Sequence, residues 1–254
     1  MRYFIEFAYN GLAYHGWQVQ PNASSVQQVL NRALSLVLDF DAQTTGAGRT
    51  DTGVHASQMF AHFDHEGISD PEYVVEKLNS FLPKDIAVKR IIPVHDTAHA
   101  RFDAVKRIYN YYIHTSKNPF LQGLSWFQKR PLNVAEMNKA AAILLEHTDF
   151  ECFSKVNTEV STFNCAVTEA RWEERGESLI FTIAADRFLR NMVRAIVGTL
   201  VNVGLGRLDI AGFEAVINSK DRKEAGISVP AHGLYLTSIE YEYITSPDGS
   251  GILL

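Results

Sequence analysis

The sequence has few cysteines, no long apolar run and no segment typical of a secretory signal. Only two of its 254 residues are cysteines, which is too few for a framework of disulfide bonds. No stretch approaches the ~20 apolar residues that a membrane helix needs, and the opening MRYFIEFAYN is only a short apolar–polar alternation. These absences argue against a disulfide-stabilised secreted protein and against a membrane protein. They predict a cytoplasmic protein with reduced, buried cysteines.

A metal-binding spacing is also missing, although the sequence contains nine histidines. His62 and His65 are close in sequence, as are His95 and His99. Neither pair has the His-Glu-x-x-His spacing of a helical zinc site, and no Cys-x-x-Cys accompanies them. The sequence therefore predicts that the protein binds no metal.

Net positive charge is lacking, yet the basic residues are clustered. The formal net charge is −5, whereas residues 101–130 carry +5, residues 187–207 carry +4 and residues 136–177 carry −5. Phosphate contacts depend on nearby Lys and Arg, so this distribution is compatible with RNA binding. A chance distribution over solvated faces is the alternative that charge alone leaves open. The basic residues of the two positive segments are Arg101, Lys106, Arg107, Lys117, Lys129 and Arg130, then Arg187, Arg190, Arg194 and Arg207.

Strand and helix patterns are mixed without regular alternation. Two capping boxes, Ser24-x-x-Gln27 and Asn133-x-x-Glu136, each predict the start of a helix. Further helices are expected at 72–82, at 187–203 and from Asp209 to about Asn218, and strands at 2–9, 58–63, 86–94, 105–115, 164–172, 178–185 and 236–243.

This mixture predicts an α+β protein with two similar-sized α/β halves. We expect the halves to form a largely antiparallel sheet flanked by helices, with the active-site cleft between them. The N-terminal half would span residues 1–104 and the C-terminal half residues 105–245. Residues 246–254, which contain proline, glycine and serine, are expected to be a disordered tail.

The segment richest in chemical information is residues 46–56, GAGRTDTGVHA. Glycines at these positions allow positive φ and let a ligand approach the backbone closely. The ordinary interpretation is a surface turn between a helix and a strand. The segment lacks the Gly-Lys-Ser/Thr ending of a P-loop, and it does not fit the dinucleotide-binding fingerprint. A nucleotide-binding loop therefore does not explain it well.

This segment resembles the active-site motif of the tRNA pseudouridine synthase A family. The resemblance covers residues 3 to about 243, nearly the whole chain. Departures such as Tyr14, where the family usually has phenylalanine, and His232 touch no expected catalytic position. The other matching segments, in order, are YHGWQ at 14–18, FDA at 102–104 with KRIYNY at 106–111, DF at 149–150 with Phe153, FLRNMVR at 188–194 with Val197-Gly198, and PAHGL at 230–234.

The resemblance implies an isomerase that converts uridine to pseudouridine in the tRNA anticodon stem-loop, at positions 38, 39 and 40. This reaction breaks the N1–C1′ bond and rejoins the uracil through C5, so it requires neither a metal nor an organic cofactor. The family forms homodimers, so a homodimer with tRNA as its partner is expected. A non-catalytic RNA-binding or chaperone protein on the same scaffold is the alternative, but it would not need Asp51. A metal-dependent hydrolase is disfavoured by the poor ligand spacing.

Three residues take catalytic roles by this resemblance. Asp51 is the nucleophile, which adds either to the base or to the sugar. Tyr109 packs on the base and handles a proton, and Arg194 pairs with Asp51 and keeps it ionised. Without the resemblance, Asp51 would be an ordinary Asx-turn residue and Tyr109 a packed strand residue.

Other basic residues are expected to bind the substrate. Arg49 would help to extrude the base or contact a flanking phosphate. Arg187, Arg190 and Arg194 recur at i, i+3 and i+7, so the sequence predicts one arginine stripe on a helix. Of these, Arg187 or Arg190 is expected to contact RNA phosphates. A solvated helix face is the ordinary interpretation of such a stripe. Lys106 and Arg107, from the first basic segment, complete the expected substrate-binding residues.

Overall fold

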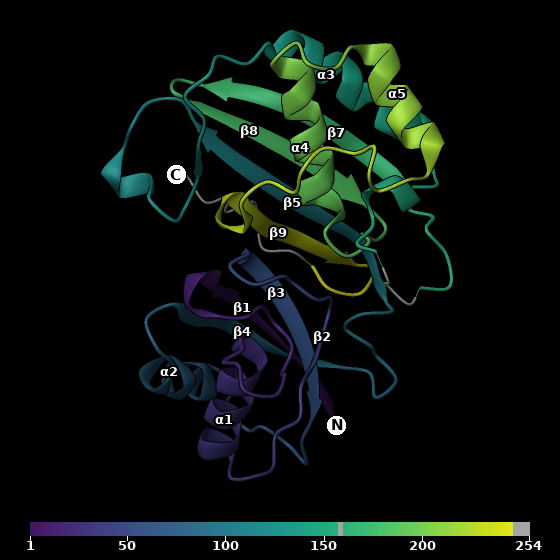
Figure 1. Cartoon of the computed structure of the whole chain (residues 1–254). Coiled ribbons are helices and arrows are strands. Elements are labelled where there is room, and N and C mark those ends of the chain that lie inside the picture. Colours follow the sequence, from purple (N-terminus) through teal and green to yellow (C-terminus); the bar gives the residue numbers. More distant parts are fainter. Residues whose placement is uncertain (157–159, 246–254) are drawn as a thin grey trace. The chain divides into compact units, whose positions relative to one another are not determined.

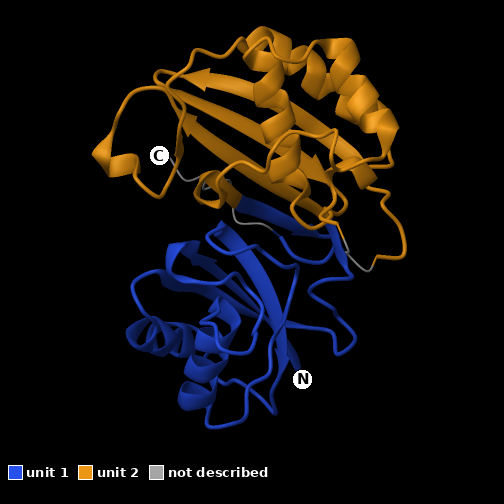
Figure 2. Ribbon diagram, in the orientation of Figure 1, with its two compact units in different colours: residues 1–105, 236–254 blue, residues 106–235 orange. Residues whose placement is uncertain are grey.

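The computed structural model describes residues 1–156 and 160–245, and it divides into two compact units (Figure 2). Unit 1 comprises Met1–Val105 and the residues from Leu236 on, and unit 2 comprises Lys106–Tyr235. A single boundary near residue 104 does not describe this division, because strand β9 (Leu234–Tyr241) carries the chain back into unit 1. The expected disordered tail at 246–254 lies outside the described residues.

The sheet of unit 1 has the strand order β4-β1-β3-β9. Strand β1 (Arg2–Tyr9) pairs antiparallel with both β3 (His55–Asp64) and β4 (Ile86–Val94), and the short β2 (Thr45–Gly46) adds to β3. Most of β1 is buried on both faces, which explains why its sequence is apolar at consecutive positions.

Two helices belong to unit 1, and polar side chains cap both. Helix α1 (Val26–Leu38) begins after Ser25, whose side chain accepts a hydrogen bond from the Gln28 N–H at 3.3 Å. The capping residue is therefore Ser25, and the prediction of Ser24 is wrong by one position. Helix α2 (Pro71–Phe81) is capped by Asp70 and has proline in its first turn.

The sheet of unit 2 is built on β5 (Ala104–His114), β8 (Ser178–Ala185) and β7 (Val167–Arg175), in that order and antiparallel. A short strand, β6 (Trp126–Phe127), pairs parallel with β5. Helices α3 (Val134–Ile143), α4 (Met192–Gly204) and α5 (Ile210–Ser219) lie on one face of this sheet (Figure 1). Eleven of the thirteen residues of α4 are buried, so this helix forms the core of the unit.

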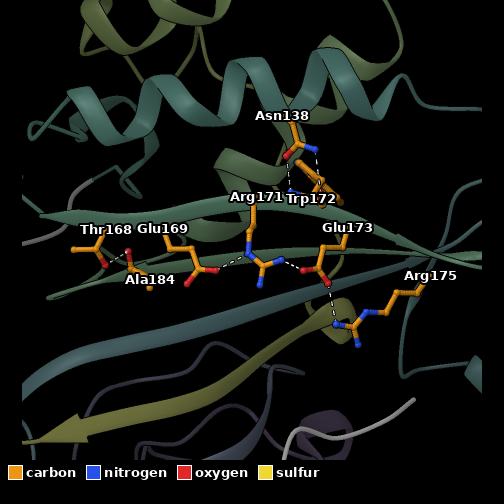
Figure 3. Close-up of polar contacts among 8 residues, drawn as sticks. All are labelled: Asn138, Thr168, Glu169, Arg171, Trp172, Glu173, Arg175 and Ala184. Atoms are coloured by element: carbon orange, nitrogen blue, oxygen red, sulfur yellow. Dashed lines mark hydrogen bonds and ion pairs between the residues drawn. The ribbon is translucent and has the colours of Figure 1, made fainter. Parts of the chain in front are cut away.

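Strand β7 carries a ladder of alternating charges on one face (Figure 3). Arg171 bonds Glu169 at 2.7 Å and also pairs with Glu173, which in turn binds Arg175 at 2.8 Å. On the opposite face, the Asn138 side chain of α3 bonds the backbone N–H and carbonyl of Trp172 (Figure 3). The two arginines of the ladder are both paired with glutamates of the same strand, so the ladder carries no net charge.

Both units combine helices with a largely antiparallel sheet, which confirms the predicted α+β class. Helix α3 begins after Asn133 and α5 after Asp209, as predicted. Within residues 1–156 and 160–245, no helix is long and apolar enough to cross a membrane.

Candidate active site

Asp51 lies in the loop between β2 and β3 of unit 1. The loop turns directly after this residue: the Val54 N–H donates to the Asp51 carbonyl at 3.1 Å, and Gly53 has a φ of 78°. Directly before it, Thr50 is buried and its hydroxyl lies 2.9 Å from the hydroxyl of Tyr9 on β1. Asp51 itself is only half-buried. Its backbone is therefore fixed on both sides while its carboxylate stands at the border of the core.

The segment of residues 14–17 packs on this loop by backbone contact. Gly16 has a φ of 89°, and a Cβ atom there would lie 2.3 Å from the Thr50 carbonyl oxygen. The Trp17 N–H donates to the same carbonyl at 3.4 Å, and the Gly53 N–H donates to the Tyr14 carbonyl at 3.3 Å. Only glycine at position 16 permits both this conformation and this close approach. The YHGWQ segment therefore positions the Asp51 loop.

Two further contacts hold the ends of the loop. The buried His55 accepts a hydrogen bond at Nδ1 from the Gly11 N–H at 3.0 Å. At the other end, the Trp17 indole covers Gly46 so closely that a Cβ atom there would lie 2.4 Å from its Nε1. Arg49, between these ends, is exposed. Its side chain is therefore accessible from solvent.

Tyr109 belongs to unit 2 and lies on β5, opposite Ile183 of β8. Its ring packs at nearly a right angle to the Phe188 ring, with centroids 5.1 Å apart and planes at 88°. Side chains two residues apart share a face of a strand, so Tyr109 lies on the same side as Tyr111. Tyr111 is fully buried, and its hydroxyl donates to the Pro230 carbonyl at 2.8 Å. Tyr109 is partly exposed and remains able to contact a ligand.

Arg194 lies in the first turn of α4, in unit 2. Its Nε donates to the Val229 carbonyl at 2.8 Å, and the Val229 N–H donates back to the Arg194 carbonyl at 3.3 Å. Burial raises the pKa of the Tyr111 phenol, and the nearby positive charge of Arg194 partly opposes this effect. Burial lowers the pKa of His232, with smaller effects from His114 and Arg194. The guanidinium is thus oriented by one backbone carbonyl beside Tyr111.

The segment that holds Arg194 lies unusually close to α4. A Cβ atom at Gly198 would lie 1.9 Å from the Ile227 carbonyl oxygen, and one at Gly226 would lie 2.7 Å from the Gly198 carbonyl carbon. The Gly226 N–H donates to the Thr199 hydroxyl at 2.9 Å. Glycine at positions 198 and 226 therefore brings Val229 within reach of Arg194.

The predicted arginine stripe is wrong. Helix α4 begins at Met192, and Asn191 before it has a φ of 66°, so residues 187–191 are not helical. Arg187 donates its N–H to the Asp186 carboxylate at 2.7 Å, and the exposed Arg190 accepts a bond from the Lys155 N–H at its carbonyl. Neither shares a helix face with Arg194.

Lys106 and Arg107 precede Tyr109 on β5, and both are partly exposed. They point to opposite faces of the strand because successive side chains alternate. Arg107 donates from Nη1 to the Asp186 carbonyl at 2.6 Å, so it ties β5 to the end of β8. The sequence did not predict Phe188 as a partner of Tyr109, because residue 188 falls within the helix expected at 187–203, whereas α4 begins only at Met192.

No group of three or more His, Cys, Asp or Glu side chains that could hold a metal ion occurs among residues 1–156 and 160–245. The paired histidines have structural partners instead. His62 accepts a hydrogen bond from the Ala100 N–H, and His95 lies 2.9 Å from the Thr97 hydroxyl.

Comparisons with known proteins identify the family of this chain. A family model described as tRNA pseudouridine synthase matches residues 6–103 and 140–242, most of the chain. The chain therefore belongs to the tRNA pseudouridine synthase family, a family of isomerases that convert uridine to pseudouridine.

The curated relatives carry a more specific name, tRNA pseudouridine synthase A. The protein of that name from Parabacteroides distasonis is 52% identical over 241 residues, covering 94% of this chain and 96% of the relative. The Bacteroides thetaiotaomicron protein is 52% identical over 243 residues, covering 94% and 90%. The Porphyromonas gingivalis protein is 50% identical over 244 residues, covering 94% and 97%.

Proposed function

We propose that this enzyme isomerises uridine in the anticodon stem-loop of tRNA, at positions 38, 39 and 40, with Asp51 as the nucleophile. The observation that carries the proposal is the setting of Asp51. The hydroxyl of its neighbour Thr50 is bonded to Tyr9 in the core, Gly16 packs on the Thr50 carbonyl, and Asp51 itself stays partly exposed. A rigidly held, accessible carboxylate suits attack on a bound nucleotide.

The reaction requires a nucleophile, a surface for the base and a partner for the negative charge. Asp51 bonds transiently to the base or to the sugar while the N1–C1′ bond breaks, and the freed uracil rotates. C5 then bonds to C1′, and the bond to Asp51 breaks to regenerate the free carboxylate. No atom enters or leaves apart from the proton exchanged between C5 and N1, so the chemistry requires neither a metal nor an organic cofactor.

Tyr109 and Arg194 supply the remaining roles in this proposal. The uracil must leave its stack to reach Asp51, and Tyr109, whose ring packs at nearly a right angle to that of Phe188, offers it an aromatic surface and a hydroxyl. Arg194 provides the cation that pairs with Asp51. Its Nε donates a hydrogen bond to the Val229 carbonyl, and because the guanidinium is planar, this bond also fixes the orientation of the terminal nitrogens.

The substrate-binding residues in this proposal are basic and accessible. Arg49, beside Asp51, contacts a phosphate next to the reacting nucleotide or fills the place that the extruded base leaves. Lys106, Arg107, Arg187 and Arg190 bind phosphates of the RNA backbone. We further propose that the enzyme is cytoplasmic and that it forms a homodimer. Sedimentation of the purified protein tests the homodimer directly.

The substitution Asp51→Asn tests the nucleophile. Unmodified tRNA is incubated with pure protein in EDTA, and pseudouridine is mapped by carbodiimide-stop primer extension. Because the change is isosteric, turnover should fall ~10³-fold or more while tRNA affinity stays nearly unchanged. Asp39→Asn, an exposed aspartate at the end of α1, is the matched control and should retain full turnover.

The same assay separates the alternative functions. Activity of Asp51→Asn within tenfold of the parent would contradict the nucleophile assignment. Parent protein that binds tRNA but forms no pseudouridine would favour the non-catalytic RNA-binding protein. Pseudouridine at other tRNA positions would overturn the assignment to positions 38, 39 and 40.

A further inference from the structure

An exposed phenylalanine lies on the loop between β4 and β5, in a segment that the catalytic roles leave unexplained. Phe102 is 75% exposed, yet its neighbours Ala98 and Ala100 are fully buried. Its ring packs on the His99 ring, with centroids 4.2 Å apart and planes at 30°. The guanidinium carbon of Arg101 lies 5.9 Å from the centre of the same ring.

The loop that carries Phe102 is held rigidly by backbone hydrogen bonds. The N–H groups of Arg101 and Phe102 both donate to His99 Nδ1, at 3.1 and 3.2 Å. The Asp103 carboxylate accepts from the His99 N–H and from the Tyr243 hydroxyl, each at 2.8 Å. The exposure of Phe102 therefore does not result from a loose loop.

A buried layer beneath the loop supports this arrangement. The His62 ring meets the His99 ring edge-on at 4.7 Å, and its Nδ1 accepts from the Ala100 N–H at 3.1 Å. The Tyr241 hydroxyl donates to the Ala100 carbonyl at 2.6 Å, and Arg2 donates to the Ala98 carbonyl at 2.9 Å. The sheet of unit 1 thus holds Phe102 in a fixed, outward position.

The charge around Phe102 favours a nucleic acid as the ligand. The Asp103 carboxylate is held by the His99 N–H and the Tyr243 hydroxyl, whereas the Arg101 guanidinium lies over the Phe102 ring, so the charge that borders the ring itself is positive. An exposed aromatic ring with an arginine beside it is the combination on which unpaired bases stack, because every base has a π-face and the phosphates favour the cation.

We propose that Phe102, flanked by Arg101, is a stacking site for an unpaired nucleobase of the RNA substrate, separate from the base that is isomerised. The proposal rests on the proposed function, because it assigns a second contact to the same RNA. Phe102 contributes affinity and positioning and takes no part in the chemical step.

The test measures affinity for an unmodified tRNA transcript by filter binding. Phe102→Ala should weaken binding ~10-fold, and Phe102→Trp should restore it because stacking needs only an aromatic face. The slope of log K against log salt should stay unchanged in both variants, whereas Arg101→Gln should reduce it. Turnover of Phe102→Ala at saturating tRNA should equal that of the parent.

Tyr73 provides a matched control on α2. It is 54% exposed and has a cation beside it, with Lys77 Nζ 5.2 Å from the ring centre. Tyr73→Ala should bind tRNA as the parent does. Equal losses for Tyr73→Ala and Phe102→Ala would overturn the proposal. Parent-like affinity of Phe102→Ala, or a change in oligomeric mass that accounts for its loss, would also overturn it.

The failure of this proposal differs from the failure of the proposed function. If the parent binds tRNA in a Phe102-dependent manner but forms no pseudouridine, the stacking site stands and the enzymatic proposal fails. If the parent forms pseudouridine and Phe102→Ala binds equally well, the opposite holds.

Discussion

Arg194 shows how a single side chain is prepared for its role by the backbone around it. Its Nε is bonded to the Val229 carbonyl, and that carbonyl is brought close by the glycine contacts on α4. Lysine would keep the positive charge but could not bond Val229 and extend a second nitrogen at the same time. The geometry therefore predicts that arginine, and not charge alone, is required.

Arg194→Met should lower turnover ~10²-fold or more, because in the proposed pairing Asp51 would lose the cation that keeps it ionised. Arg194→Lys should recover only part of that loss, and both variants should bind tRNA almost as the parent does. The measurement is single-turnover pseudouridine formation beside filter binding.

Arg190→Met is the matched control for this prediction, because Arg190 is exposed and precedes the helix. It should weaken tRNA binding without changing the single-turnover rate. A rate loss in Arg190→Met equal to that in Arg194→Met would contradict the assignment of the ion pair with Asp51 to Arg194.

His62 gives unit 1 a dependence on pH. Burial, with smaller effects from Arg2 and His99, lowers the pKa of His62 from 6.5 to about 4, while Asp64 and Asp103 oppose the shift. The folded state therefore disfavours the charged ring. The stabilisation that neutral His62 provides is complete above about pH 6.5 and is lost as the pH falls toward 4.

The free energy of unfolding should consequently rise between pH 4 and 6.5, with His62 contributing up to ~1.4 kcal/mol per pH unit. His62→Asn can still accept the Ala100 N–H bond but cannot titrate, so its slope should be smaller by up to that amount. Urea unfolding at several pH values measures both slopes. His99, whose pKa is also lowered by burial, keeps the slope of the variant above zero. Equal slopes in parent and variant would contradict the assignment.

At the scale of elements, the Asp51 loop depends on glycine at one position of a neighbouring segment. Gly16→Ala forces a side chain into a φ of 89° and places Cβ 2.3 Å from the Thr50 carbonyl. It should lower the free energy of unfolding by about 1–3 kcal/mol and reduce turnover as well, because the loop must shift. Urea unfolding and the pseudouridine assay check the two effects.

Gly48→Ala is the comparison within the loop itself, since a Cβ atom there would meet nothing within 4 Å. Its free energy of unfolding should change by less than about 0.5 kcal/mol. A similar destabilisation by both substitutions would show that the contact between Gly16 and Thr50 is unimportant.

Helix starts show where the sequence was sufficient and where it was not. Asn133 and Asp209 were predictable as caps because one side chain at each site can accept the bond. At α1, Ser24 and Ser25 are each followed three residues later by glutamine, so the pattern fits two positions equally well. At α4, the apolar periodicity continues upstream of the true start, and the left-handed Asn191 interrupts it without a sequence signal.

In the candidate site, too, local motifs could be read from the sequence, whereas contacts between distant segments could not. The roles of Asp51, Tyr109 and Arg194 are predicted from the resemblance of local motifs. The contacts that position them could not be, because Gly16 meets Thr50 and Val229 meets Arg194 only after distant segments have packed together. Periodicity within one segment does not encode such pairs.

At the scale of the whole molecule, tRNA binding should weaken steeply with salt despite the net charge of −5. The affinity depends on the local basic segments, so log K should fall linearly with log salt. The paired arginines of β7 give an internal control. Arg175→Gln, which removes one member of the charge ladder, should leave the slope unchanged, whereas Arg107→Gln should reduce it. A flat line for the parent would contradict the role of the basic segments.

The return of β9 into unit 1 has a consequence for biosynthesis. Unit 2 is one continuous stretch, whereas unit 1 needs both ends of the chain. The Gln58 side chain of β3 accepts a hydrogen bond from the Ile239 N–H of β9 at 2.8 Å, and the rings of Phe4 and Phe60 pack on the Tyr241 ring of β9. None of these contacts can form before β9 has been synthesised. A nascent chain leaving the ribosome therefore presents the Asp51 unit first and completes it last. The apolar residues of β3 therefore lack β9, one of their neighbouring strands, until residues 234–241 have been translated.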